Sequence, residues 1–379
     1  MTRRPERAPA ASATMHVVQS LAALSVGGSE LVAVELCEHL RQHGHRVTVL
    51  GAAGPLSERV AACGGEPLDW PVGRKRPATL KYIRRLRAWL EAQRPDIVHA
   101  HSRLPAWVCW RALRSMSPGR RPALITSVHG QYTVSPYSAI MTRGDRVIAV
   151  SEHIRRYTLE NYPRVDPDRV VTIHGGISRD GFPRGHRPAP EWHAATEREF
   201  PLLRGKRLLL LPGRLSRYKG HATFLELLAA VAEDYPDTHG VILGPGRPGS
   251  RYRAELEGLA ERSGILERVT FTGQRADIRD WMAASAIVFN LCSDPPEAFG
   301  RTVPEALYLG IPVIAWDHGG VREVLAGMFA AGAVPPGSFE GLLRKTRAFL
   351  DRRPEVPDSD AFSLHESMAR TMHLYQELI

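Results

Sequence analysis

The chain has 379 residues, 43% of them hydrophobic and 24% charged. This length exceeds what one hydrophobic core usually spans and indicates two globular domains. No apolar run comes close to the ~20 residues that a membrane-spanning helix needs. The formal net charge of +10 favours an anionic partner such as a nucleotide, an acidic lipid or a nucleic acid. The nucleic acid is disfavoured, because the sequence has no helix-turn-helix, zinc-knuckle or aromatic-interleaved sheet motif.

Residues 1–14 are rich in Arg, Pro and Ala and lack an apolar core, so we expect a disordered arm and not a secretion signal. The cysteines lie far apart, without a C-x-x-C pair; they are Cys37, Cys63, Cys109 and Cys292. This spacing predicts reduced core thiols in a cytoplasmic protein, with neither a disulfide framework nor a metal site.

From residue 16 onward, short apolar runs typical of strands alternate with helical patterns such as residues 30–42. The alternation predicts an α/β fold of parallel sheets with helices on both faces. A stretch rich in Pro, Gly, Arg and His at residues 178–201 interrupts the rhythm and predicts an interdomain linker. The expected strands before it are 16–21, 46–50, 97–100, 123–128, 146–150 and 170–174, and those after it are 207–211, 240–243, 269–272, 286–289 and 312–315. We therefore expect two Rossmann-like domains with ligands beyond the carboxyl ends of their strands.

The most informative motif lies at residues 297–305, where Glu297 and Glu305 flank seven residues at an expected loop-to-helix junction. Backbone N–H groups in the first turn of such a helix favour anions. Carboxylates accept hydrogen bonds from hydroxyl groups. The pattern therefore predicts a site for a phosphorylated polyol.

This motif and others along the chain resemble glycosyltransferase family 4, whose members are retaining enzymes of the GT-B fold that use nucleotide-sugars. The matching segments are GGSE at 27–30, GHRVTV at 44–49, DIVHAH at 96–101, SVHG at 127–130, VIAVSE at 147–152, GRL at 213–215, KG at 219–220, PEAFG at 296–300, EAL at 305–307, GIPVIA at 310–315 and GGVRE at 319–323. The resemblance implies an acceptor domain at residues 15–185, a donor-nucleotide domain at 186–362 and a final helix at 363–379 that crosses back to the first domain.

The resemblance also implies roles for the two glutamates. Glu305 is expected to accept hydrogen bonds from the ribose hydroxyls, and Glu297 from hydroxyls of the transferred sugar. The alternative for each is a surface carboxylate. The loop after Glu297 is expected to line the donor site with Ala298, Phe299, Gly300 and Arg301.

Two cations and one histidine complete the expected catalytic group with Glu297. Arg214 and Lys219 would neutralise the leaving diphosphate, so we expect no metal or other cofactor. His129 ends a strand, and the resemblance implies that it lies near the reacting sugar and the acceptor. An exposed basic loop and a structural histidine remain the alternatives.

Glycines are expected to bring backbone close to the donor. Gly27 and Gly28 open the first helix, where their amides would face the diphosphate. Gly244 begins a literal G-x-G-x-x-G at residues 244–249, but the next expected strand ends without the acidic residue of a dinucleotide site. We therefore place Gly244 at the edge of the nucleotide base.

Other patterns carry less functional information. The D-x-D pairs at residues 166–168 and 358–360 lie in proline-bearing stretches, so we interpret them as turn residues and not as a metal-binding motif. His99 and His101 alternate on one strand, but no third ligand with suitable spacing supports zinc.

Residues 74–94 carry eight basic residues and a single acid, Glu91. A helix here would bury Leu80, Ile83, Leu86 and Leu90 and expose Lys81, Arg84 and Arg85, with Tyr82 and Trp89 at the border. Basic residues beside aromatic ones suit an anionic membrane surface. A solvated outer helix is the alternative.

The sequence thus predicts a metal-independent, retaining glycosyltransferase of the cytoplasm, peripheral on the inner membrane face. Its expected partners are a nucleotide-sugar and a surface-glycan or lipid-linked acceptor, with lipopolysaccharide core as the favoured class, and no nucleic acid. The alternatives are a GT-B-like epimerase or phosphorylase, or a non-catalytic nucleotide-sugar binding protein. One departure from the family lies at His174-Gly175-Gly176, where Asn-Gly is usual.

Overall fold

The computed structural model describes residues 14–246 and 250–379, so the arm expected at residues 1–14 lies outside the description except for its last residue. By their contacts these residues form two compact units. The first takes in the chain as far as Ala149, together with residues 158–171 and 370–379. The second comprises residues 150–157 and 172–369.

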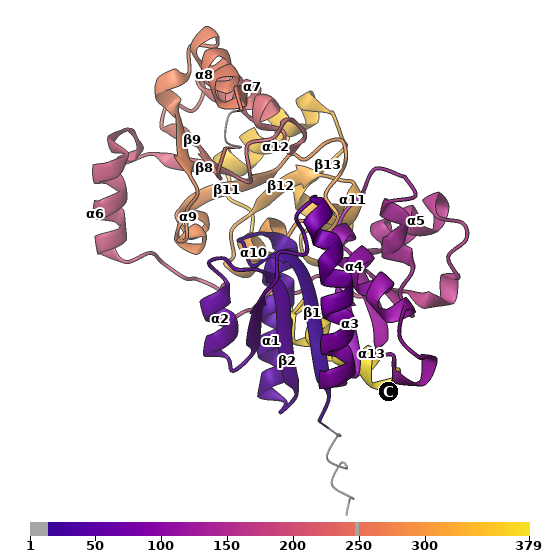
Figure 1. Ribbon diagram of the computed structural model, residues 1–379. Coiled ribbons are helices and arrows are strands. Elements are labelled where there is room, and N and C mark those ends of the chain that lie inside the picture. Colours follow the sequence, from indigo (N-terminus) through magenta and orange to yellow (C-terminus); the bar gives the residue numbers. More distant parts are fainter. Residues whose placement is uncertain (1–13, 247–249) are drawn as a thin grey trace, which may run out of the picture. The chain divides into compact units, whose positions relative to one another are not determined.

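The described part of the first unit contains a seven-stranded sheet flanked by helices (Figure 1). Its strands are β1 (His16–Ala23), β2 (Arg46–Ala52), β3 (Glu66–Asp69), β4 (Ile97–Ala100), β5 (Ala123–Val128), β6 (Arg146–Ala149) and β7 (Val170–Thr172), in the order β3-β2-β1-β4-β5-β6-β7. Its helices are α1 (Gly28–Gln42), α2 (Ser57–Ala62), α3 (Lys81–Gln93) and α4 (Arg103–Arg114). The central strand β1 pairs in parallel with both β2 and β4, so Val17 lies beside Val47 and Ile97.

The described part of the second unit contains a six-stranded sheet in the order β10-β9-β8-β11-β12-β13. These strands are β8 (Arg207–Pro212), β9 (Thr238–Leu243), β10 (Val269–Gly273), β11 (Ser285–Asn290), β12 (Val313–Trp316) and β13 (Ala333–Val334). The helices are α6 (Pro190–Glu199), α7 (His221–Val231), α8 (Tyr252–Arg262), α9 (Ile278–Ala283), α10 (Thr302–Tyr308), α11 (Gly319–Met328) and α12 (Phe339–Asp351). Two more helices, α5 (Glu152–Asn161) and α13 (Leu364–Gln376), have residues in both units.

The expected α/β fold with two Rossmann-like parallel sheets is confirmed, and every strand expected from the sequence is present. The edge strands β3 and β13 were not expected. β3 has the sequence Glu-Pro-Leu-Asp and is largely exposed, so it lacks an apolar run, and β13 has only two residues.

The stretch expected as a linker contains helix α6, which begins with Pro190. Trp192 anchors this helix in the second unit: its ring lies 5.2 Å from that of Trp281, and its Nε1–H donates to Asp277 at 2.7 Å. Proline suits the first turn of a helix. Part of the stretch expected as a linker, residues 190–199, is therefore a packed helix.

The basic segment expected as one helix forms a 3₁₀ turn, η1 (Pro77–Leu80), followed by α3. Leu80, expected in the buried stripe, is 67% exposed, and Tyr82, expected at the border, is buried against Trp70. The correction has a geometric reason. A 3₁₀ turn has three residues per turn and not 3.6, which rotates Leu80 away from the stripe of α3.

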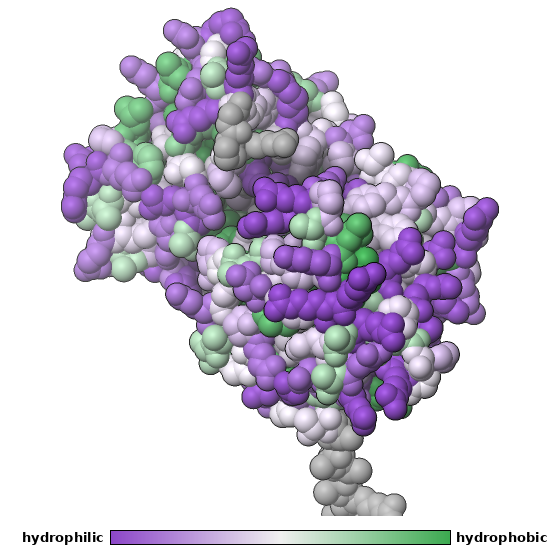
Figure 2. Space-filling model, in the orientation of Figure 1, coloured by the Kyte–Doolittle hydropathy of each residue, from purple (hydrophilic) through white to green (hydrophobic). Residues whose placement is uncertain are grey.

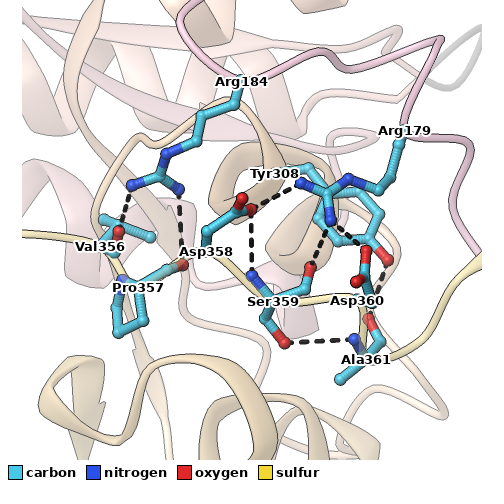
Figure 3. Close-up of polar contacts among 9 residues, drawn as sticks. All are labelled: Arg179, Arg184, Tyr308, Val356, Pro357, Asp358, Ser359, Asp360 and Ala361. Atoms are coloured by element: carbon cyan, nitrogen blue, oxygen red, sulfur yellow. Dashed lines mark hydrogen bonds and ion pairs between the residues drawn. The ribbon is translucent and has the colours of Figure 1, made fainter.

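Two arginines hold the extended segment that follows α12 (Figure 3). Arg179 forms ion pairs with Asp358, at 2.6 Å, and with Asp360. Arg184 donates to the backbone carbonyls of residues 356 and 357. The D-x-D pair interpreted as turn residues is therefore also an arginine-binding element of the second unit.

Among the described residues, no helix is both long enough and apolar enough to cross a membrane.

The core of the second unit is built around α7, whose Leu225 is fully buried together with Phe224 and Phe289. Leu225→Ala should lower the free energy of unfolding by about 2–5 kcal/mol, because the deleted methyl groups leave a cavity. Urea denaturation followed by circular dichroism is the measurement. Leu266→Ala is the matched control, since Leu266 is 44% exposed, and should change the free energy by less than about 0.5 kcal/mol. Equal losses in the two variants would contradict this core.

Candidate functional site

Loops after β8, β9 and β11 gather at one edge of the second sheet, because parallel neighbours end on the same side. Hydrogen bonds between the loops hold them together. The N–H of Gly213 donates to Leu243 O at 2.8 Å, and that of Ser293 to Tyr218 O at 2.8 Å. The expected donor-site residues of this unit lie on these loops and on the helix that follows.

Lys219 and Glu297 form an ion pair in which each side chain is about one-fifth exposed, at 19% and 20%. Burial is the largest single influence and lowers the pKa of Lys219, but the Glu297 carboxylate, together with Cys292 and Tyr218, outweighs it and the net pKa is raised. Burial also raises the pKa of the neighbouring Cys292 thiol to about 12. The site therefore holds a charged lysine beside a neutral thiol.

Glycine at position 220 allows Lys219 to approach the loop after β11. Its φ of +78° lies in the left-handed region. A Cβ atom there would lie 2.2 Å from Leu291 O, which is closer than any van der Waals contact.

Arg214 and Gly244 lie on neighbouring loops. A Cβ atom on Gly244 would lie 2.1 Å from the carbonyl oxygen of Gly213, so the backbone of the two loops is in direct contact. The Arg214 side chain is exposed, and its Nη2 lies 3.4 Å from the Tyr218 hydroxyl. The remaining glycine-loop residues, 247–249, lie outside the described residues.

The loop after Glu297 is packed, not free. The N–H of Gly320 donates to Glu297 O at 2.9 Å, and Gly300 has a φ of +80° with Val321 against it. The Phe299 ring is buried and lies 5.8 Å from the Phe362 ring. Ala298 lies against the same turn, since a Cβ atom on Gly320 would meet its carbonyl oxygen at 2.0 Å.

Glu305 is 7% exposed on α10, which excludes the alternative of a solvent-facing carboxylate. Its Oε1 lies 3.5 Å from Nε of Arg301. Arg301 also donates through Nη1 to Gly176 O at 3.4 Å. A carboxylate has several lone pairs and can accept further hydrogen bonds beside its arginine partner, which suits an acceptor for hydroxyl groups.

In the first unit, Gly27 caps helix α1 and Gly28 is its first residue. A Cβ atom on Gly27 would lie 2.5 Å from the Glu30 carboxylate. This carboxylate accepts a hydrogen bond from the Ser29 hydroxyl at 2.8 Å. An acidic side chain thus lies at the helix end where we expect the diphosphate.

His129 follows β5 and is partly exposed. Its Nε2 lies 3.0 Å from Nδ1 of His101, and burial lowers the pKa of His129 to about 4. The sequence singles out His101 only for its spacing from His99, which without a third ligand does not support zinc. His101 follows β4 and His129 follows β5. The two residues are 28 positions apart in the sequence, so no local motif could have shown that they are in contact.

Glu323 ends the matching segment GGVRE, but the sequence alone predicts no role for it. Its carboxylate accepts from His174 at 2.7 Å and from the N–H groups of Glu152 and His153 at 2.9 and 2.8 Å. Burial raises its pKa, but these hydrogen bonds outweigh burial and the net pKa is lowered. The histidine that departs from the family pattern therefore has a defined partner.

Two family models match the chain: Glycosyltransferase Family 4 at residues 26–180 and Glycosyl transferases group 1 at residues 194–361. The chain belongs to glycosyltransferase family 4. The predicted family and enzyme class are confirmed: the protein is a retaining glycosyltransferase. Family 4 enzymes generally use nucleotide-sugar donors without a bound metal.

Sequence relatives and solved structures agree with the assignment to family 4. The phosphatidyl-myo-inositol mannosyltransferase of Mycobacterium leprae is 29% identical over 86% of this chain and 84% of its own length. The lipopolysaccharide core biosynthesis mannosyltransferase LpsB of Rhizobium meliloti is 25% identical over 59% of this chain and 61% of its own length. The crystal structure of a glycosyltransferase from Rickettsia africae superposes with a TM-score of 0.82 over 97% of this chain and 99% of that chain, at 22% identity. The GT-B fold expected from the sequence is thereby confirmed.

Glu305→Gln keeps the shape of the side chain in this family-4 site but removes its charge. We expect binding of UDP or GDP, whichever is tighter, to weaken by about 1.5–3 kcal/mol, because the ribose hydroxyls lose a charged acceptor. Isothermal titration calorimetry measures the change. Glu340→Gln, on the exposed first turn of α12, should bind as the unchanged protein does. An unaltered affinity in Glu305→Gln would remove Glu305 from the nucleotide site.

Proposed function

We propose that the protein transfers a hexosyl group from a nucleotide-sugar to a lipid-linked or surface-glycan saccharide, of which lipopolysaccharide core is one class. The partly buried Lys219–Glu297 pair is the observation that carries this proposal. It combines a fixed cation for a diphosphate with a carboxylate for sugar hydroxyls.

In the proposed reaction the bond between the anomeric carbon and the diphosphate breaks, and the diphosphate leaves with the electron pair. The acceptor hydroxyl oxygen forms the new bond on the same face, and its proton leaves with the diphosphate. Lys219 and Arg214 stabilise the charge that develops on the leaving group, and the partial burial of Lys219 strengthens its contribution. Glu297 orients the sugar. No metal takes part.

Lys219→Ala and Arg214→Ala should each lower kcat by ~10²–10³ while changing KM less, because they remove stabilisation of the leaving diphosphate. The measurement is release of nucleoside diphosphate from the nucleotide-sugar that gives the largest thermal shift. Arg217→Ala is the control, since the exposed Arg217 side chain pairs with Glu255, and should retain full turnover.

The same assay tests the role of metal. Turnover should survive EDTA and retain the anomeric configuration. Activity that is lost with EDTA and restored by magnesium or manganese would contradict the proposed mechanism.

A pocket on the first unit supports a lipid-bearing acceptor at the inner membrane face. It has a volume of about 910 Å³, within the ~300–1,000 Å³ typical of small-molecule sites. Its apolar lining comes from α3, α4 and the preceding turns: Leu80, Ile83, Leu104, Trp107 and Val108. Its cationic lining residues are Arg74, Lys75, Arg76, Arg84 and Arg111. An anionic headgroup joined to an apolar chain complements both.

The surface around this pocket has the same character. Figure 2 shows apolar residues bordered by hydrophilic ones on the face that carries α3 and α4. Lys81, Arg84 and Arg85 are exposed on α3 as the sequence predicted. Arg85 lies 4.3 Å above the Trp70 ring. Cations beside aromatic and apolar groups suit the headgroup layer of an anionic membrane.

Replacing Lys81, Arg84 and Arg85 together by Gln should reduce sedimentation with phosphatidylglycerol vesicles, because surface attraction contributes ~1 kcal/mol per cation. High salt should reduce binding of the unchanged protein in the same way, since screening acts over ~8 Å at physiological ionic strength. A control with the same change in charge replaces exposed arginines of the second unit, namely Arg198, Arg262 and Arg344. Equal binding by all three proteins would contradict the membrane proposal.

A further inference from the structure

A continuous chain of hydrogen-bonded side chains runs through the first unit from helix α13 to His129. Tyr375 on α13 contacts Gln19 Nε2 at 3.2 Å. Gln19 Oε1 lies 2.5 Å from His101 Nε2, and His101 Nδ1 lies 3.0 Å from His129 Nε2. A branch leads from Tyr375 to His99 Nδ1 at 2.6 Å.

The interior of this chain is shielded from water. Gln19 and Tyr375 are 0% exposed, and His99 and His101 are at most 2% exposed. Burial lowers the pKa of His101 well below its usual value and that of His99 to about 3. Each buried histidine is therefore neutral and carries one N–H group, so the position of that hydrogen is decided by its neighbours.

The Gln19 amide is oriented with Nε2 toward Tyr375 and Oε1 toward His101. An amide N–H group only donates, so the Tyr375 hydroxyl accepts from Gln19 at 3.2 Å and directs its own hydrogen to His99 Nδ1, 2.6 Å away.

The hydrogen of His129 follows from this direction. The Gln19 oxygen can only accept, so the hydrogen of His101 lies on Nε2. His101 Nδ1 then carries a lone pair and accepts from Nε2–H of His129. Because His129 is neutral, its Nδ1 is unprotonated, and among the described residues it has no hydrogen-bond partner.

We propose that Gln19, His101 and Tyr375 are positioning residues that hold His129 in its Nε2–H tautomer, so that Nδ1 accepts a hydrogen bond from a sugar hydroxyl. The identity of that hydroxyl rests on the proposed function, but the tautomer does not. His129 acts here as a neutral acceptor and not as a cation for the diphosphate. Tyr375 connects this role to the last helix of the chain.

The tautomer is tested by ¹⁵N NMR of the full chain with labelled histidine, without ligand and at pH 7. The His129 signals are assigned by their loss in His129→Gln. We expect a protonated Nε2 and an unprotonated Nδ1. A hydrogen on Nδ1, or a doubly protonated ring, would overturn the proposal whether or not the protein proves to be a transferase.

Substitutions among the hydrogen-bonded side chains should change the ¹⁵N signals that report the tautomer of His129. Tyr375→Phe removes the group that orients the Gln19 amide, so both tautomers of His129 should appear. Tyr162→Phe is the matched control, since the Tyr162 hydroxyl is buried without a hydrogen-bond partner in the described structure, and should leave the signals unchanged. A single unchanged tautomer in Tyr375→Phe would also overturn the proposal.

Kinetics separate positioning from a purely structural role. His101→Asn keeps an oxygen near the place of Nδ1, whereas His101→Leu removes the acceptor. We expect kcat/KM to fall roughly tenfold in His101→Leu, the cost of about one hydrogen bond, and to be largely restored in His101→Asn. Nucleoside-diphosphate affinity should be the same in both variants. Equal kcat/KM values for the two would contradict the positioning role.

Discussion

Parallel pairing of strands brings the carboxyl ends of neighbours to one edge of a sheet, and the donor-site loops of the second unit and the histidine contacts of the first depend on that constraint. In the second unit it brings together loops that carry Lys219 and Glu297, which are distant in the sequence. In the first it aligns the ends of β4 and β5, so that His101 and His129 meet at 3.0 Å. Glycine at positions 220 and 244 lets neighbouring loops pack against each other at this edge of the second sheet, because a Cβ atom at either position would clash with the backbone of the adjacent loop.

The two units use burial in opposite ways. In the second, burial opposes the charge of Lys219, but the carboxylate of Glu297 and its neighbours together outweigh burial, and the ion pair persists. In the first, the described contacts of His99, His101 and His129 include no carboxylate, so burial lowers their pKa values and leaves them neutral, joined by hydrogen bonds and ring contacts. A charged pair suits the stabilisation of a diphosphate, whereas a neutral chain suits the orientation of hydroxyl groups.

Electrostatic contacts also explain two features of the sequence, the histidine at position 174 and the D-x-D pair at residues 358–360. His174, which stands where the family usually has asparagine, is paired with Glu323, and the same carboxylate caps the first N–H groups of α5. The D-x-D pair near the end of the chain contacts Arg179. Both cases show acidic side chains that satisfy buried or partly buried donors.

The sequence by itself determined the order of strands and helices, the two Rossmann-like sheets, the family and the candidate donor residues, because apolar periodicity and local motifs are properties of neighbouring residues. It missed β3, β13 and α6, since short edge strands and a proline-led helix lack a strong apolar pattern. Only the tertiary structure showed that Leu80 is exposed and Glu305 buried. It alone joined Gln19, His101, His129 and Tyr375, because contacts across as many as 356 positions depend on how strands and the last helix pack, which no local pattern records.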